Sequence, residues 1–197
     1  MQCVDGARRV PTVGEQPARR TLIEATISSI HRHGLAATTV GTVTEIAGLS
    51  RGMVRHVFSS KAEMLAETFT VLVDEWTAAT EPARDAAPGE GLETTIRAMF
   101  APDVFTDERV AAWLALSAAA SASPELRSVR ERAQRSWAEH LERSLTELGV
   151  DRPADRAIAL LALADGLWLR QALEPAALPR DVAETIALDI ARLVIHG

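Results

Sequence analysis

Apolar residues recur every three or four positions along most of the chain, which is the period of an amphipathic α-helix. This helical spacing prevails over the strict alternation that a half-buried strand would show. Proline and glycine interrupt the pattern at intervals and so mark the ends of the expected helices. The sequence therefore predicts an all-α fold of about nine helices.

Local signals place the ends of several of these helices. Gly34 ends the first helix, and Thr39 and Ser50 are N-caps for the second and third. A capping box over residues 60–63 opens the fourth helix, which ends before Pro82. The expected helices cover about residues 18–33, 40–47, 51–57, 60–81, 91–101, 106–121, 124–148, 154–173 and 180–195, with a loop at 82–90.

The net charge of −6 is distributed unevenly along the chain. Residues 1–65 hold eight Lys and Arg against five Asp and Glu, a net charge of +3, whereas the remainder holds 13 against 22, a net charge of −9. Attraction of phosphate needs a local positive face rather than a positive molecule. The asymmetry is therefore compatible with a nucleic-acid-binding head on an acidic body, although solvated charged faces are common in any protein.

Residues 39–61 place two short helical segments on either side of a glycine turn, as a helix-turn-helix requires. The second segment would enter the major groove, where its Arg and His side chains reach bases or phosphates. Thr39, the backbone near Ser50 and Lys61 are placed to bind phosphates, the last two with the help of helix N-termini. The candidate DNA-binding residues are Thr39, Ser50, Arg51, Gly52, Met53, Arg55, His56 and Lys61.

The helix-turn-helix segment resembles that of the TetR family of repressors. The resemblance rests on Thr39, on Ala-Gly-Leu-Ser-Arg-Gly at 47–52, on His-Val-Phe at 56–58 and on Ser-Lys at 60–61. Members usually carry a tyrosine beside the histidine to contact phosphate, but this chain has no tyrosine. Arg55 is the candidate to replace that contact.

The C-terminal half is similar to the BetI-type branch, whose members include repressors of choline-to-betaine genes. The similarity is carried by Ala-Trp-Leu-Ala-Leu at 112–116, Pro-Glu-Leu at 124–126 and Asp-Gly-Leu-Trp-Leu-Arg at 165–170. The two resemblances together span about residues 18–195. The branch contains regulators of many pathways, so it implies a ligand-binding helical domain more strongly than it implies choline.

Aromatic side chains on the body helices are candidates for an effector pocket, because an aromatic wall suits a cation or a flat apolar molecule. At helical spacing, aromatic residues are more often plain core. Asp165 lies in an apolar helix and should need a cation, for which Arg170 or an arginine across the interface is favoured over a ligand. The candidate ligand-binding residues are Phe69, Trp76, Phe100, Trp113, Trp137, Asp165 and Trp168.

The helix expected at 154–173 is apolar nearly all round, so something must cover it. A second subunit is the expected cover, with the helix at 180–195 beside it. Gly166 costs about 1 kcal/mol against alanine in a helix, which suggests a close helix approach there. The candidate dimer-interface residues are Leu160, Leu163, Gly166, Leu167, Arg170, Ile186, Ile190 and Leu193.

The sequence gives little support for a membrane protein, a disulfide, a metal site or a hydrolase. The longest apolar run has eight residues, too short for a membrane span, and no signal peptide is evident, so a cytoplasmic location is expected. The single cysteine, Cys3, excludes an intrachain disulfide, and His31 and His33 point apart on a helix, so we assign no metal and no cofactor. Residues 48–52 match a G-x-S-x-G nucleophile elbow, but a helical segment precedes them where the elbow needs a strand.

These patterns predict a homodimeric repressor that binds a palindromic operator and is released by a small-molecule effector. Residues 1–17 would form a flexible leader, 18–65 the DNA-binding domain and 66–197 the ligand-binding and dimerisation domain. The recognition helices would lie about 34 Å apart, and the fourth helix would carry the signal because it joins both domains. The alternative is an all-helical adaptor without DNA affinity, and an enzyme has the least support because no catalytic constellation accompanies the helices.

Overall fold

The computed structural model describes residues 15–84, 86 and 88–196. The described residues form nine α-helices and one short 3₁₀ helix, with no strands among them, as the sequence predicts. In chain order these are α1 (Glu15–Ala37), α2 (Val40–Ala47), α3 (Arg51–Val57), α4 (Lys61–Thr80), η1 (Glu81–Arg84), α5 (Pro88–Ala98), α6 (Asp107–Ala119), α7 (Pro124–Glu147), α8 (Pro153–Leu173) and α9 (Arg180–His196).

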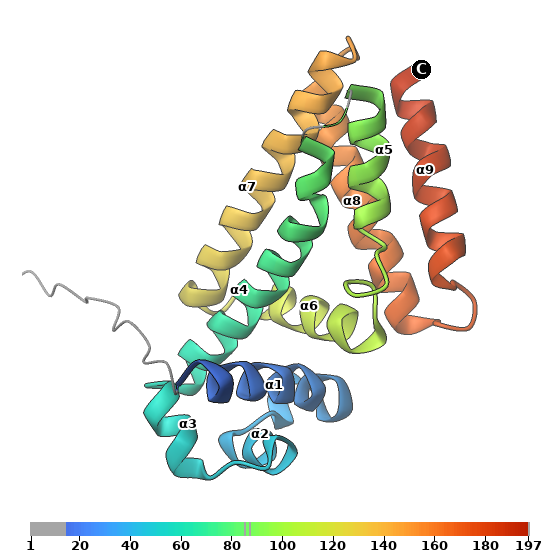
Figure 1. The fold of residues 1–197 in the computed structure, drawn as a ribbon. Coiled ribbons are helices and arrows are strands. Elements are labelled where there is room, and N and C mark those ends of the chain that lie inside the picture. The colour runs from blue at the N-terminus through green and yellow to red at the C-terminus, as the bar shows by residue number, and fades with distance from the viewer. Residues whose placement is uncertain (1–14, 85, 87, 197) are drawn as a thin grey trace, which may run out of the picture.

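The helices form a small head and a larger body (Figure 1). Helices α1 to α3 make the head, and α4 runs from it into the body beside α7. Helix α6 lies across the base of the body and packs against α1, while α5, α8 and α9 stand above it. The joint between head and body therefore consists of α4, by continuity of the chain, and the α1–α6 contact.

The expected helix limits are right to within a few residues except at three places. Residues 15–17, assigned to the leader, belong to α1, and the rest of the leader lies outside the described residues. Gly34 does leave helical geometry, with φ 76° and ψ 162°, but one further turn follows it. The expected loop at 82–90 is partly helical, because η1 occupies its start and α5 begins at Pro88.

The N-caps of the head follow the sequence, with one difference in detail. The Thr39 hydroxyl accepts from the backbone N–H of Thr42, whose hydroxyl accepts from the Thr39 N–H in return at 2.8 Å, a capping box that was not expected. The Ser60 hydroxyl accepts from the Glu63 N–H at 3.0 Å as expected. The Glu63 carboxylate, however, accepts from the backbone N–H of Ser59 rather than from that of Ser60.

Candidate DNA-binding surface and effector site

Helices α2 and α3 are joined by a turn at a glycine with positive φ, a conformation that glycine adopts without strain. Gly48 has φ 65° and ψ 25°, and Leu49 donates its N–H to the Thr44 carbonyl at 3.1 Å. An L side chain at Gly48 would have to adopt this left-handed conformation at a cost of about 1 kcal/mol or more. The turn thus fixes the angle at which α3 leaves α2.

Helix α3 has one buried and one exposed face. Val54 and Val57 are buried in the head, whereas Arg51 and Arg55 point to solvent. His56, Gly52, Ser50, Thr39 and Lys61 are also exposed, and Met53 is half-buried. Seven of the eight candidate DNA-binding residues are therefore open to solvent, and Met53 is partly so.

The basic side chains of this surface are available to a ligand. Within the described part of the chain, Arg51, Arg55 and Lys61 form no ion pair. Gly41, which sequence reasoning did not single out, lies beside the Arg51 guanidinium: a Cβ built there would stand 3.3 Å from Nη2 of Arg51 and 3.4 Å from Oγ1 of Thr39. The start of α2 and the start of α3 thus converge on one point.

Arg19 of α1 holds α3 in place and was also missed. Its Nη2 donates to the Val57 carbonyl at 2.9 Å, its guanidinium lies 5.0 Å from the Phe58 ring centroid, and it forms an ion pair with Glu67 of α4. These contacts connect the end of α3 to both α1 and α4. The orientation of the exposed α3 face is therefore tied to the helix that enters the body.

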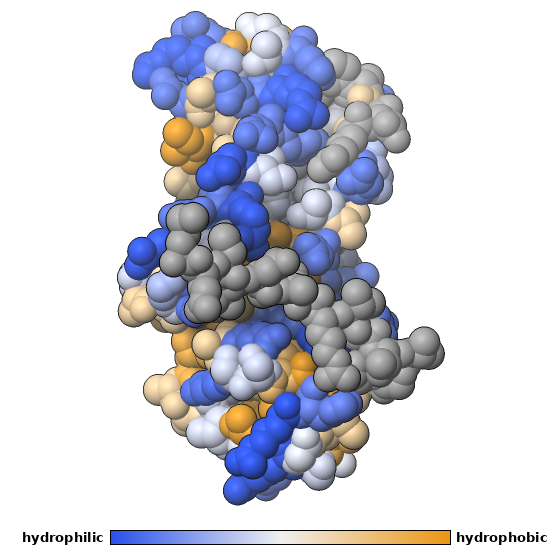
Figure 2. Space-filling view, turned by 90° about the vertical axis from the view of Figure 1, so that its left-hand side faces the viewer, coloured by the Kyte–Doolittle hydropathy of each residue, from blue (hydrophilic) through white to orange (hydrophobic). Residues whose placement is uncertain are grey.

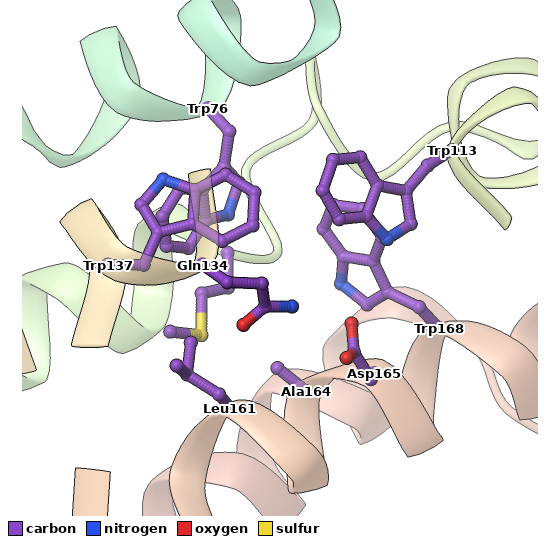
Figure 3. Close-up of a pocket in the computed structure, with 9 residues that line it drawn as sticks. Trp76, Trp113, Gln134, Trp137, Leu161, Ala164, Asp165 and Trp168 are labelled. Carbon is purple, nitrogen blue, oxygen red and sulfur yellow. The ribbon is translucent and has the colours of Figure 1, made fainter. Parts of the chain in front are cut away.

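All four tryptophans of the chain meet in the body, each from a different helix (Figure 3). The ring centroids of Trp76 (α4) and Trp137 (α7) are 3.9 Å apart, and that of Trp113 (α6) lies 5.2 Å from Trp137 and 5.8 Å from Trp168 (α8). We call this cluster the tryptophan cage. It encloses a cavity of about 20 Å³ that is also lined by Met99, Gln134, Leu161, Ala164 and Asp165.

Five of the seven candidate ligand-binding residues line this cavity and two do not. Phe69 packs behind Trp113, with its ring centroid 5.1 Å away, and Phe100 packs on Phe105 at 5.2 Å. Both phenylalanines are fully buried. A volume of about 20 Å³ holds roughly one water molecule, so an effector needs side chains of the cage to move apart.

The polar groups of the cage differ from expectation. The Asp165 side chain is 40% exposed rather than buried, and it pairs with Arg130 of α7 at 3.2 Å. The expected partner Arg170 instead pairs with Glu174 at 2.9 Å. The indole N–H of Trp168 is buried and finds no acceptor among the described residues, so it can donate to a ligand oxygen.

The first turn of α6 connects the cage region to the head. Arg109 donates from Nε to Glu75 of α4 at 2.9 Å and from Nη2 to Glu24 of α1 at 3.2 Å. The hydrogen bond that Arg109 donates to Glu75 is the main reason that the pKa of Arg109 lies above its usual value, and the charges of both glutamates add to it. A second small cavity, of about 10 Å³, lies between Arg109, Glu75 and the tryptophans. A shift of α6 would therefore change its contact with α1.

The expected dimer-interface residues fall into three groups by their exposure. Leu160 and Leu167 are buried within the protomer, at 3% and 7% exposure, so they belong to its own core. Leu163 and Ile186 are half-buried. Gly166, Arg170, Ile190 and Leu193 are exposed, and nothing lies within 4 Å of a Cβ built at Gly166, so the close approach expected there is not made within the protomer.

Neither a metal-ligand cluster nor a membrane-spanning helix is found among the described residues. No group of three or more His, Cys, Asp or Glu in the described part of the chain is placed to hold a metal ion. None of the helices described is long and apolar enough to cross a membrane. The G-x-S-x-G segment at 48–52 follows α2, so it does not have the strand that a nucleophile elbow needs.

Known proteins share both parts of this architecture. Residues 22–68 match the model of the bacterial regulatory proteins of the tetR family, and residues 88–196 match that of the BetI-type transcriptional repressor C-terminal domain. The HTH-type transcriptional regulators BetI of Agrobacterium fabrum and Rhizobium meliloti are each 34% identical to this chain, over 86% and 91% of it and 84% and 89% of their own lengths.

Solved structures agree with the sequence relatives. A transcriptional regulator from Rhodococcus sp. superposes with a TM-score of 0.81 at 29% identity, covering 91% of this chain and 94% of its own. A putative transcriptional regulator from Saccharomonospora viridis, solved in complex with choline, gives 0.78 at 20% identity, with 90% and 96% covered. The chain thus belongs to the TetR family of DNA-binding transcriptional repressors, which are not enzymes, and it carries a BetI-type C-terminal ligand-binding domain.

Proposed function

We propose that the protein is a homodimeric repressor whose two heads bind the half-sites of a palindromic operator, and that a small organic cation bound in the tryptophan cage releases it. The observation that carries this proposal is the convergence of four tryptophans, from four helices, on one cavity that also has a carboxylate at its edge. DNA binding, dimerisation and effector binding would each use a different part of the molecule.

DNA binding is supported by the exposed face of α3. Arg51 and Arg55 are free of ion pairs within the described residues and can donate in pairs to guanine or phosphate oxygens. The start of α4, where Lys61 follows the Ser60 cap, offers a helix N-terminus that attracts phosphate. Thr39 and Ser50 supply hydroxyls at the starts of α2 and α3. These groups would position the head, and α3 would read bases.

Dimerisation is supported by the apolar face of α8 and α9. The exposed large hydrophobic residues of the described chain all lie on these two helices, at Ile158, Leu169, Leu173, Val182, Ile190 and Leu193. On α8 they share a stripe with the exposed Ala162 and Gly166, which leave room for another helix to approach. The outer face of α7, by contrast, is mainly hydrophilic (Figure 2).

The occupant of this face is proposed to be a second copy of the chain. A stripe of aliphatic side chains exposed up to 71% is costly in water, and an isologous contact between two α8–α9 pairs would cover both stripes at once. Leu169, Leu173 and Leu193 are its proposed centre. Leu160 and Leu167 would support it from beneath, as part of the core of each protomer.

An organic cation suits the cage because the faces of indole rings attract cations and the nearby carboxylate of Asp165 adds to that attraction. The choline complex of the Saccharomonospora regulator makes choline a suitable probe. A hydroxyl on the cation would have a donor in the unpartnered indole N–H of Trp168. The signal would pass to the head through α4, which joins both domains, and through the Arg109 contacts of α6 with α1.

A salt-dependent titration tests the DNA-binding part of the proposal. The purified protein is titrated against DNA from upstream of its own gene and against a random duplex of equal length. We expect the upstream DNA to bind about a thousandfold tighter or more, with affinity falling steeply as salt rises. Equal, weak binding of both duplexes, with and without choline, would favour the adaptor alternative.

A further inference from the structure

Arg130 places a positive charge at the edge of the tryptophan cage. The Arg130 guanidinium lies over the Trp113 ring, with Cζ 5.3 Å from the centroid, and its Nη2 is 3.2 Å from the Asp165 carboxylate. An aromatic face and a carboxylate are the two groups that an organic cation in the cage would use. Arg130 therefore stands where the effector's charge would stand.

Arg130 also connects three helices of the body. It belongs to α7, pairs with Asp165 of α8 and donates from Nη1 to the Ser117 hydroxyl of α6 at 3.0 Å. Ser117 and Trp113 lie one turn apart on the same face of α6. The Arg130 guanidinium therefore contacts this face at two successive turns. The opposite end of α6 carries Arg109, which contacts the head.

The size of the cavity adds a second constraint. At about 20 Å³ it is too small for even a trimethylammonium group while the surrounding side chains stay in place. The Arg130 side chain is 26% exposed, and its long apolar stem allows the guanidinium to swing into solvent, where water hydrates its charge. Movement of Arg130 frees both the Trp113 face and the carboxylate.

We propose that Arg130 is a tethered cation that occupies the cation subsite of the cage, and that an organic cation binds by displacing it from Trp113 and Asp165. This inference rests on the proposed effector site. Displacement also breaks the bond to Ser117 and releases α6 from α7 and α8. Arg130 is thus a specificity and positioning residue that lowers the affinity for cations and couples their binding to the movement of α6.

Tryptophan fluorescence measures this competition directly, because the chain has four tryptophans, all in the cage, and no tyrosine. The probes are choline and its uncharged isostere 3,3-dimethylbutan-1-ol. The variants are Arg130→Met, which keeps an apolar stem without the charge, and Arg132→Met as the matched control. Arg132 is exposed on the same helix, and among the described residues its side chain hydrogen-bonds only to Ser128 of that helix.

We expect Arg130→Met to bind choline about tenfold tighter than the wild type, because a partly exposed ion pair and a cation–π contact no longer compete. The uncharged alcohol should gain much less, and Arg132→Met should behave as the wild type. Addition of Asp165→Asn to Arg130→Met should cancel the gain for choline. In Arg130→Met, choline should also change the affinity for the upstream DNA less than in the wild type, because the link to Ser117 is already absent.

A choline affinity that is unchanged or lower in Arg130→Met, with wild-type binding intact, would overturn the tethered-cation proposal and leave the effector site standing. If choline altered the fluorescence of neither protein, the proposed effector class would fail and the inference with it. Should Arg130→Met not fold, Ser117→Ala serves instead, because it removes one anchor of the guanidinium. That variant should bind choline roughly threefold tighter, and no change would likewise count against the proposal.

Discussion

The head and the body of this repressor carry out recognition in opposite ways. In the head, the proposed DNA-binding residues come from one stretch of 23 residues, 39–61, and all but the half-buried Met53 are exposed. In the body, the cage needs side chains from four helices between residues 76 and 168, and these enclose almost no free volume. Under the proposed function the head could bind DNA as it stands, whereas the cage would have to open for an effector, and this opening would be how the body regulates the head.

The largest effect should follow from charging the apolar face of α8 and α9. The double variant Leu173→Glu with Leu193→Glu replaces two leucines that are 70% and 71% exposed by charged residues. Because neither leucine is in the core, each protomer should still fold. We expect monomers, and a loss of operator affinity of about a thousandfold because the two heads no longer bind as a linked pair. Light scattering gives the mass, and a DNA titration gives the affinity.

Arg135→Glu on the hydrophilic face of α7 is the control for added negative charge, and it should remain dimeric. A double variant that stays dimeric would show that another surface holds the subunits together.

The next largest effect should come from the exposed face of α3. Arg51→Ala with Arg55→Ala removes two unpaired guanidinium groups and should lower operator affinity about a hundredfold, with the salt slope reduced by about two. Choline binding, measured by tryptophan fluorescence, should not change. Arg132→Ala with Arg135→Ala on α7 carries the same charge change and should keep operator affinity; equal losses in both variants would point to a general charge effect.

A smaller effect should separate binding from coupling. Arg109→Gln breaks the contacts of α6 with Glu75 and Glu24, so choline should shift operator affinity roughly fivefold less than in the wild type. Affinity for each ligand alone should stay close to normal. Arg97→Gln is the control, because Arg97 also pairs with two glutamates but lies on α5, away from the head. Undiminished coupling in Arg109→Gln would show that these contacts do not carry the signal.

The smallest effect should compare one N-cap in each region. Ser50 caps α3 and Ser123 caps α7, and each hydroxyl accepts from a backbone N–H three residues on. Replacement of either serine by alanine should cost about 1 kcal/mol in the free energy of unfolding, measured in urea. Only Ser50→Ala should also weaken operator binding, because only α3 lies at the DNA surface.

The difference between the regions also decides what the sequence predicts. The head follows from local signals: the caps at Thr39, Ser50 and Ser60 and the turn at Gly48 all lie where they were expected. Its unexpected features, Gly41 beside Arg51 and the contacts of Arg19, depend on residues that are separated in the sequence.

In the body, helical periodicity shows which residues face inward but not which of them meet. It therefore includes Phe69 and Phe100, which pack behind the cage, and assigns the buried Leu160 and Leu167 to a dimer interface. The pairing of Asp165 with Arg130, 35 residues away on another helix, has no local signature at all. Long-range packing is thus what the sequence pattern leaves open.

The most direct test of the account is the reciprocity between the cage and the head. The choline dissociation constant is measured by tryptophan fluorescence with and without saturating upstream DNA, and the DNA dissociation constant with and without saturating choline. Linkage requires the two ratios to be equal, and we predict that each ligand weakens the other by the same factor, about tenfold or more. Choline that binds the cage with the same affinity in the presence and absence of DNA would contradict the account.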